Sequence, residues 1–154
     1  MQLFVERKVI NFDEIHDWFV RQSVDGLIKP SEYHITVAYS RKDVNLQNLE
    51  FDTSTLLIPG NQFNGLEIFG DYLVQLVLTD VKLFSRFNYF KQNGCSWDYP
   101  SYCPHISIAE HTKTDLNEIE PYQGNIILGP EIWEELNTDF SYERDDDEDR
   151  SIIR

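Results

Sequence analysis

The sequence is poor in residues that cross-link a chain or bind soft metals, with two cysteines and one methionine among 154 residues. Cys95 and Cys103 lack Cys-x-x-Cys spacing, and we expect both to be reduced thiols. A zinc site built on Cys103 and His105 would lack a full ligand set with recognisable spacing. No acidic cluster with metal-ligand spacing is evident in the sequence either. We therefore predict a protein that uses neither a metal nor a cofactor.

Basic residues are also scarce, with 13 lysines and arginines against 27 aspartates and glutamates and a formal net charge of −14. Proteins that grip polymeric nucleic acid usually present a basic face. This sequence shows no basic cluster, which argues against long RNA or DNA as a partner. The charge still permits a small anionic ligand, because a few hydrogen bonds in a pocket can hold it.

Long apolar runs are missing as well. No segment approaches the roughly 20 apolar residues of a membrane span, and charges interrupt the first residues where a signal peptide needs an apolar stretch. We expect a cytoplasmic protein that does not bind membranes. The hydrophobic content of 41% is typical of a globular chain. We predict one domain over residues 1–140 and an acidic, mobile tail over residues 141–154.

One short phrase occurs twice in the sequence. Residues 33–38 read YHITVA, and residues 104–109 read PHISIA. The period of two and the β-branched residues predict a β-strand at each place. Side chains two positions apart share a face of a strand. Each strand therefore offers an imidazole and a hydroxyl on one face, His34 with Thr36 and His105 with Ser107, and aliphatic residues on the other.

The segment before the first histidine strand has its own order. We predict a strand over residues 2–6 and then a helix with Asn11 as its N-cap. Glu14 stands three residues after Asn11, as in a capping box. Gly26 and Pro30 mark the loop that leads to the histidine strand.

The second half of the chain repeats this order. We predict a strand over residues 72–79 and a helix that Thr79 or Asp80 caps and Gly94 ends. The apolar stripe of this helix is expected to comprise Leu83, Phe84, Phe87 and Phe90. The two histidines lie 71 residues apart in matching contexts. This internal repeat predicts two lobes around a cleft.

Four further strands are expected between and after the two halves. Their predicted ranges are 53–58 and 66–69, separated by Pro59-Gly60, and 124–128 and 132–136, separated by Gly129-Pro130.

The paired His-x-hydroxyl phrase suits chemistry on a phosphodiester. An attacking oxygen must lose a proton and a leaving oxygen must gain one, and two imidazoles can do both near neutral pH. The hydroxyls of Thr36 and Ser107 can donate to the non-bridging oxygens, where charge accumulates in the transition state. We predict His34, Thr36, His105 and Ser107 as catalytic residues, without assigning which histidine is the base and which the acid.

This pair of phrases resembles the signature of the two-histidine (2H) phosphoesterase superfamily, and it carries onto His34, Thr36, His105 and Ser107 without a gap. The resemblance implies a pseudo-symmetric, bilobed α+β fold. In that fold, two mostly antiparallel sheets surround a central cleft and the helices pack outside. It also implies metal-independent cleavage or ring opening of phosphodiesters.

Longer stretches resemble one branch of that superfamily, the anti-CBASS cyclic-nucleotide phosphodiesterases of bacteriophages. The stretches are LFVERKVINFDEIHDW, YHITVAYSR, GCSWDYPSYCPHISIAE and EPYQGNIILGPEIWEEL. The resemblance covers about residues 2–140. It implies cleavage of the cyclic di- and trinucleotides, such as 3′,3′-cyclic GMP–AMP, that arm a bacterial immune system. It places the protein in the cytoplasm of the infected host cell.

Three positions depart from the pattern of that branch. Ser107 stands where a threonine is common, which keeps a hydroxyl. Phe4 stands where relatives often carry tyrosine; its ring still stacks on a base, but a phenol hydrogen bond is lost. Phe140 stands where a tryptophan is expected near the end of the fold. We predict Phe4 and Phe140 as substrate-binding residues.

Three other residues are candidates for substrate binding. Glu131 and Glu134 lie beside the last predicted strand pair, where a carboxylate can accept a hydrogen bond from an adenine amino group; the alternative for each is a solvated strand end. Trp97 lies in the loop before His105 together with Tyr99 and Tyr102. These rings either stack on bases or pack the loop and position His105.

Two other functions compete with cleavage of cyclic oligonucleotides. One is RNA end processing on 2′,3′-cyclic phosphates or 2′–5′ bonds, against which the acidic composition argues. The other is sequestration of a cyclic nucleotide without cleavage. The expected partner is a small cyclic oligonucleotide, and the chain is expected to be a monomer or a weak homodimer.

Overall fold

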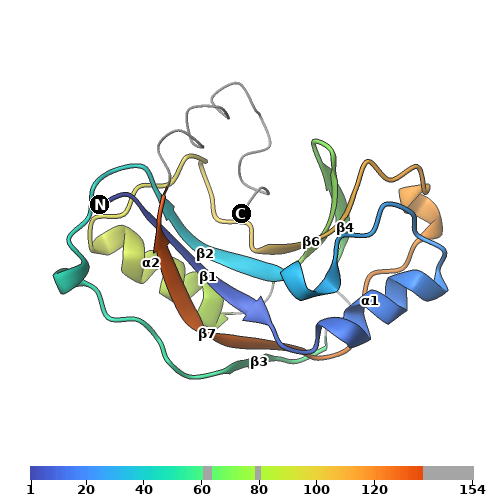
Figure 1. Cartoon of the computed structure of the whole chain (residues 1–154), viewed down its shortest axis with the longest axis horizontal. Helices are drawn as coiled ribbons and strands as arrows, with labels where there is room; N and C mark the ends of the chain where they lie inside the picture. The colour runs from blue at the N-terminus through green and yellow to red at the C-terminus, as the bar shows by residue number, and fades with distance from the viewer. Residues whose placement is uncertain (61–63, 79–80, 137–154) are drawn as a thin grey trace.

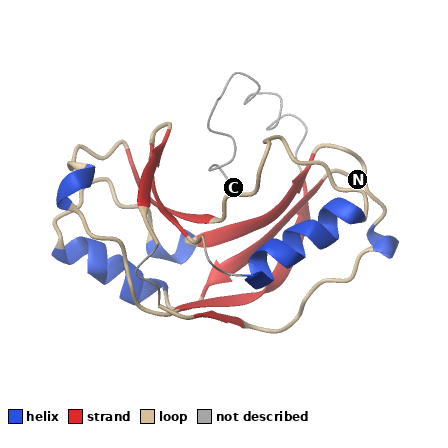
Figure 2. Cartoon of the chain, turned by 180° about the vertical axis from the view of Figure 1, so that it is seen from behind, coloured by secondary structure: helices blue, strands red, loops and turns tan. Residues whose placement is uncertain are grey.

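The computed structural model describes residues 1–60, 64–78 and 81–136. These residues form two β-sheets and two α-helices, together with three short 3-10 turns (Figures 1 and 2). The strands are β1 (Leu3–Val9), β2 (His34–Ser40), β3 (Leu56–Ile58), β4 (Leu66–Phe69), β5 (Tyr72–Leu76), β6 (His105–Glu110) and β7 (Ile126–Glu135). The helices are α1 (Phe12–Arg21) and α2 (Val81–Gln92), and the turns are η1 (Pro30–Glu32), η2 (Leu46–Asn48) and η3 (Leu116–Glu118).

The larger sheet has the strand order β2-β1-β7-β3, and the smaller sheet has the order β4-β5-β6. Every pairing within these two sheets is antiparallel. The prediction of an α+β fold with two mostly antiparallel sheets is therefore confirmed. Each predicted histidine strand forms an edge of its sheet, and the edges β2 and β6 contact each other. No helix of the described ranges is long and apolar enough to cross a membrane.

The two lobes share the same ladder between their central and histidine strands. The equivalent pairs are Phe4–Tyr39 and Tyr72–Glu110, Val5–Ala38 and Leu73–Ala109, Glu6–Thr36 and Val74–Ser107, Arg7–Ile35 and Gln75–Ile106, and Lys8–His34 and Leu76–His105. Both ladders skip the residue directly after the hydroxyl residue, Val37 in β2 and Ile108 in β6, which is a β-bulge. The register therefore gives each residue from Phe4 to Lys8 a structural counterpart in β5.

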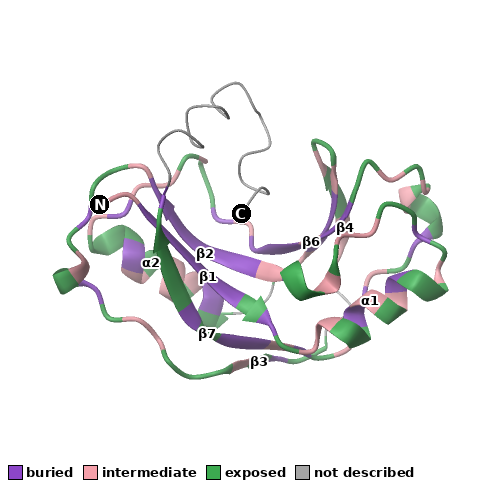
Figure 3. Ribbon diagram, in the orientation of Figure 1, coloured by how far each residue is buried: buried purple, intermediate pink, exposed green. Residues whose placement is uncertain are grey.

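The two helices join the lobes into one core. Phe19 of α1 packs in a cluster that holds Leu73 of the smaller sheet and Leu128 of the larger sheet. Helix α2 follows β5 of the smaller sheet, but its Phe90 lies in a cluster with Val5 of β1. Figure 3 shows β1, β2 and β6 largely buried, whereas the edge strand β4 is more exposed. The histidine strands thus rest on packed, shared structure.

Helix α2 follows its sequence prediction closely. Leu83 and Phe90 are buried, and Phe84 and Phe87 pack against the core. Gly94 follows the last turn with φ of 105°, a left-handed conformation that suits glycine. The predicted caps Thr79 and Asp80 lie outside the described residues.

The capping box predicted for α1 is wrong, although the helix begins directly after Asn11 as expected. The Asn11 side chain makes no cap hydrogen bond. Its Oδ1 accepts from the backbone N–H of Ile127 at 2.9 Å, and its Nδ2 donates to the carbonyl of Asn125 at 2.8 Å. The Asn11 amide thus pairs with backbone groups at the start of β7. The sequence around the helix does not reveal this contact.

The predicted break at Gly129-Pro130 is also wrong, because β7 runs through it as one strand. The register between β1 and β7 shifts between Arg7 and Val9, which places a β-bulge at this dipeptide. A bulge tolerates the missing N–H of proline. The strand predicted over residues 53–58 is shorter, starting at Leu56.

A buried arginine lies beneath the larger sheet. The Arg7 side chain is fully buried, and its Nη2 forms an ion pair with Asp52 at 2.6 Å. Its Nη1 donates to the carbonyls of Ser54 at 3.0 Å and Gly129 at 2.9 Å. Burial raises the pKa of the Asp52 carboxyl, but hydrogen bonds from Ser54 and Arg7 outweigh it and hold that pKa well below its usual range.

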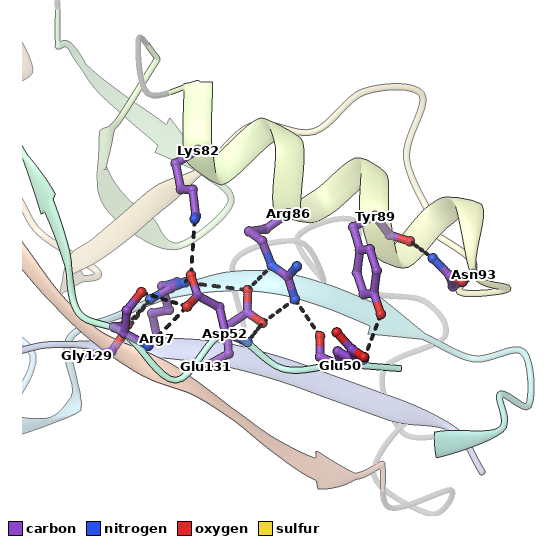
Figure 4. A network of polar contacts seen from close by, with 10 residues as sticks. Arg7, Glu50, Asp52, Lys82, Arg86, Tyr89, Asn93, Gly129 and Glu131 are labelled. Atoms are coloured by element: carbon purple, nitrogen blue, oxygen red, sulfur yellow. Dashed lines mark hydrogen bonds and ion pairs between the residues drawn. The ribbon is translucent and has the colours of Figure 1, made fainter. Parts of the chain in front are cut away.

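Glu131 belongs to the same network (Figure 4). Its carboxylate, which is fully buried, accepts two hydrogen bonds of 2.8 Å from the Arg86 guanidinium of α2. It also accepts the backbone N–H of Asp52 at 2.8 Å and lies 3.7 Å from Nη2 of Arg7. Glu131 of β7 thus links Arg7 of β1, the segment before β3 and helix α2.

We expect Glu131→Gln to lower the free energy of unfolding by about 3–5 kcal/mol, because the buried Arg7 guanidinium and the partly buried Arg86 guanidinium then lose one balancing charge. Urea unfolding followed by circular dichroism measures this. Glu135→Gln is the matched control on the same strand, since Glu135 is exposed; its change should stay within about 0.5 kcal/mol. Equal stabilities for the two variants would contradict the assigned role.

Candidate active site

His34 opens β2, and each of its ring nitrogens faces an oxygen atom. Nδ1 lies 2.9 Å from the carbonyl oxygen of Glu32 in η1. Because a carbonyl only accepts, this contact places a proton on Nδ1. Nε2 lies 3.8 Å from Oε2 of Glu6 on β1. The other oxygen of Glu6 forms an ion pair of 2.8 Å with Lys8.

His105 repeats the first of these contacts. Its Nδ1 lies 2.9 Å from the carbonyl of Cys103, which again stands two residues earlier in the chain. Burial lowers the pKa of His105 to about 4, and the nearby His34 adds to this effect while the hydrogen bond with Cys103 opposes it. His105 is therefore neutral at pH 7, with its proton on Nδ1 and a lone pair on Nε2. Phe69 packs edge-on against the ring, with centroids 5.3 Å apart.

The two hydroxyl residues lie where the period-two pattern predicts them, each on the face of its histidine. Thr36 is 6% exposed, and its Oγ1 is buried without a hydrogen-bond partner among the described residues. Leaving a buried hydroxyl without a hydrogen bond costs roughly 1–3 kcal/mol of stability. A ligand oxygen that accepts a hydrogen bond from Thr36 would recover that free energy. Ser107 is partly exposed and borders a cavity.

That cavity, of about 380 Å³, brings the two lobes together. It is lined by His34 of the larger sheet and Ser107 of the smaller sheet. The rest of its lining is Gly26, Leu27, Ile28, Glu32, Tyr72 and Glu110. The prediction that the two phrases face one shared space thus matches the geometry for His34 and Ser107. His105, on the same strand as Ser107, is buried and is not among the lining residues.

Phe4 and Glu134 lie on the His34 face of the larger sheet. They are opposed residues of β1 and β7, and with Glu6, Ile132 and Trp133 they line a second hollow of about 40 Å³. The Phe4 ring meets His34 edge-on, with centroids 6.2 Å apart. The structure thus brings these two predicted substrate-binding residues together next to one predicted catalytic residue.

The other predicted substrate-binding residues that the structure describes do not line this hollow. Glu131 points to the opposite face of β7, where its carboxylate is held by Arg86. A base could reach it only by displacing that guanidinium. Phe140 lies outside the described residues.

Trp97 packs among rings of the loop and of α2. It meets Phe87 edge-on at 5.2 Å and Tyr102 at 5.7 Å, and it also packs against the cluster of Phe4 and Tyr39. Tyr102 stacks on Phe87 with centroids 4.4 Å apart, and its hydroxyl donates to the buried carbonyl of Thr36 at 2.6 Å. The loop before His105 is therefore tied to the strand of His34, as the packing alternative expects.

Sequence reasoning missed Glu6, Glu32, Tyr72 and Glu110 as residues of this site. The signal for Glu6 is its place two residues after Phe4 on a predicted strand, which puts both on one face. Glu32, Tyr72 and Glu110 reach the site through the pairing of strands and the course of loops. The periodicity of the sequence does not specify either. Within residues 1–60, 64–78 and 81–136, no group of three or more His, Cys, Asp or Glu side chains is arranged to hold a metal ion.

Comparison with known proteins identifies the family. The family model described as anti-CBASS protein Acb1 matches residues 1–143. The chain belongs to this family. It is 33% identical over 141 residues to an anti-CBASS protein Acb1 of Caulobacter sp. (strain RHG1), covering 88% of this chain and 22% of the relative. It is 27% identical over 146 residues to one of Sphingomonas paeninsulae, covering 90% of this chain and 23% of the relative. The chain thus spans less than a quarter of the length of these relatives.

The fold is similar to that of a solved 2H phosphoesterase. The crystal structure of Escherichia coli LigT complexed with 3′-AMP superposes with a TM-score of 0.54 at 11% identity, covering 88% of this chain and 95% of LigT. The resemblance to the anti-CBASS family is confirmed, and the likeness to LigT confirms the expected fold.

Tyr102→Phe is expected to lower the free energy of unfolding by about 1–3 kcal/mol, because the buried Thr36 carbonyl loses its hydrogen-bond donor. Tyr33→Phe is the matched control: Tyr33 is 1% exposed, and its hydroxyl has no hydrogen-bond partner among the described residues. Removing that hydroxyl should leave stability unchanged or raise it. Guanidinium unfolding of both variants compares them, and a larger loss for Tyr33→Phe would refute the assignment.

Proposed function

We propose that the chain is a phosphodiesterase that opens cyclic di- and trinucleotides at their 3′–5′ bonds and so counters CBASS defence in the host cytoplasm. The observation that carries the proposal is the repeated site geometry. Two strands from two sheets each present a histidine whose Nδ1 is fixed by the carbonyl two residues earlier, and a hydroxyl two residues later. Membership of the anti-CBASS family supports the substrate class.

The two imidazoles differ in ways that suit different proton-transfer roles. The neutral ring of His105 has a lone pair on Nε2, which suits a general base. The Nε2 atom of His34 lies 3.8 Å from Oε2 of Glu6, so a carboxylate stands beside the nitrogen that we assign to the general acid. The counterpart of Glu6 in the other lobe is Val74, which offers no charge. The two lobes therefore differ beside the histidines, and the reaction needs one histidine to act as base and the other as acid.

The proposed reaction follows from these roles. Nε2 of His105 takes the proton of the ribose 2′-hydroxyl next to the scissile bond, and that oxygen attacks phosphorus. The bond from phosphorus to the 5′-oxygen breaks, and His34 donates its Nε2 proton to that oxygen. Thr36 and Ser107 donate hydrogen bonds to the non-bridging oxygens as negative charge builds up on them. Hydrolysis of the resulting 2′,3′-cyclic phosphate runs with the two histidines in reversed roles.

Residues near the site support a nucleotide as the substrate. Phe4 is 2% exposed and borders the hollow next to His34, and Glu134, directly opposite it, offers an acceptor for a base amino group. The proposal needs no metal, since the four catalytic residues account for both proton transfers and for charge stabilisation.

The test is incubation of purified protein with 3′,3′-cyclic GMP–AMP in EDTA, with the products separated by chromatography. Wild type should yield linear products, and His34→Ala or His105→Ala should lower the rate by about 10²–10⁴-fold. His16→Ala is the control, because His16 lies on α1 against Tyr33 and should leave the rate unchanged. Loss of the wild-type activity in EDTA would overturn metal independence. Preference for an RNA ending in a 2′,3′-cyclic phosphate would instead establish RNA end processing.

The pH dependence tests the role of His105. A general base with a pKa of about 4 is lost only as the pH falls through that value, because protonation then removes its lone pair. We therefore expect kcat/KM for the cyclic dinucleotide to stay on its plateau below pH 6 and to fall by tenfold per pH unit only near pH 4. An acidic limb near 6.5, the usual value for histidine, would contradict the assignment.

A further inference from the structure

The proposed function leaves one end of the 380 Å³ cavity without a role. The proposed reaction uses His34 and Ser107 on its wall, and Phe4 and Glu134 beside the smaller hollow are assigned to a single base. The remaining lining includes the Tyr72 ring and the Glu110 carboxylate, which oppose each other across β5 and β6. A cyclic dinucleotide has two bases, so its second base needs a place as well.

The ladder register relates these residues to the Phe4 hollow. Phe4 is the fourth residue before Lys8, which opposes His34, and Tyr72 is the fourth residue before Leu76, which opposes His105. Because both ladders carry their bulge at the same step, Tyr72 is the structural counterpart of Phe4 and lies on the face of its histidine. Each lobe therefore carries one aromatic residue at the same ladder position relative to its histidine.

Each ring is also opposed by one carboxylate. Glu134 of β7 opposes Phe4, and Glu110 of β6 opposes Tyr72. The Glu110 side chain is 47% exposed, and its Oε2 lies 3.7 Å from Nε2 of His111. A partly exposed carboxylate keeps acceptor capacity for a ligand, and Glu32 adds a second carboxylate to the same cavity.

We propose that Tyr72 and Glu110 form a second base-binding subsite, in which the base on the far side of the macrocycle stacks on the Tyr72 ring and donates its edge N–H groups to Glu110. This rests on the proposed function, since it names how that same site holds the second nucleotide. The pseudo-two-fold axis of the protein then matches the pseudo-two-fold axis of a cyclic dinucleotide. The favoured second base is a purine with an amino donor, because the two carbonyl oxygens of uracil would face carboxylates.

Kinetics of Tyr72 variants test the stacking role. Tyr72→Leu keeps an apolar strand residue but removes the ring, and it should raise KM for 3′,3′-cyclic GMP–AMP about 5- to 100-fold. Its kcat should change less than threefold, because stacking is equal in the ground and transition states. Tyr72→Phe should keep the wild-type KM. Ile68→Ala is the control, since Ile68 opposes Leu73 on the other face of the same lobe and is 46% exposed.

Base selectivity tests the role of Glu110. Wild type should have a higher kcat/KM for 3′,3′-cyclic GMP–AMP than for 3′,3′-cyclic UMP–AMP, and Glu110→Gln should reduce that ratio at least fivefold. An unchanged ratio in Glu110→Gln would remove Glu110 from the subsite.

Failure of the subsite is distinguishable from failure of the proposed function. If wild type cleaves the dinucleotide and Tyr72→Leu has an unchanged KM, the subsite is wrong and the proposed function stands. If wild type does not cleave it, calorimetric titration of the same ligand decides: weaker binding by Tyr72→Leu than by wild type supports the subsite, and equal or absent binding overturns it.

Discussion

The candidate active site depends on one local interaction, the hydrogen bond between each histidine Nδ1 and the carbonyl two residues earlier. It is made by Glu32 for His34 and by Cys103 for His105, at 2.9 Å in both cases. The bond fixes the tautomer and the ring plane, so Nε2 is the nitrogen left for a substrate. Because the bond spans only three residues, it can be present twice in a duplicated strand without help from long-range packing.

Long-range packing then makes the two copies unequal. The same ladder position holds Glu6 in one lobe and Val74 in the other, and burial holds the pKa of His105 low. Two locally identical histidines thereby meet different electrostatic environments. In the proposed reaction, this difference in burial and in the neighbour on the adjacent strand separates the base from the acid.

The sequence predicted those features that depend on short-range pattern. The period-two phrases predicted β2 and β6 with their histidines and hydroxyls, and the helical stripe predicted α2. The features that the sequence did not predict depend on the register between strands. The Asn11 side chain bonds to the start of β7 and makes no cap hydrogen bond, and the Gly129-Pro130 dipeptide lies in a bulge and not at a strand end. Glu131 and Glu134 look alike in sequence, yet one is buried with Arg86 and the other lies on the face of Phe4, since only the ladder decides which face each takes.

The shared core has a consequence for how the site can move. Residues of α1, β5, β6 and β7 belong to one apolar cluster, and α2 extends from that cluster to the strands of the larger sheet. The lobes are therefore not two bodies on a hinge, and the separation between the imidazoles is set by packing. If the proposed function holds, a macrocycle must adapt its own ring pucker and backbone torsions to this spacing, and substrates are then selected by the conformations that their rings can reach.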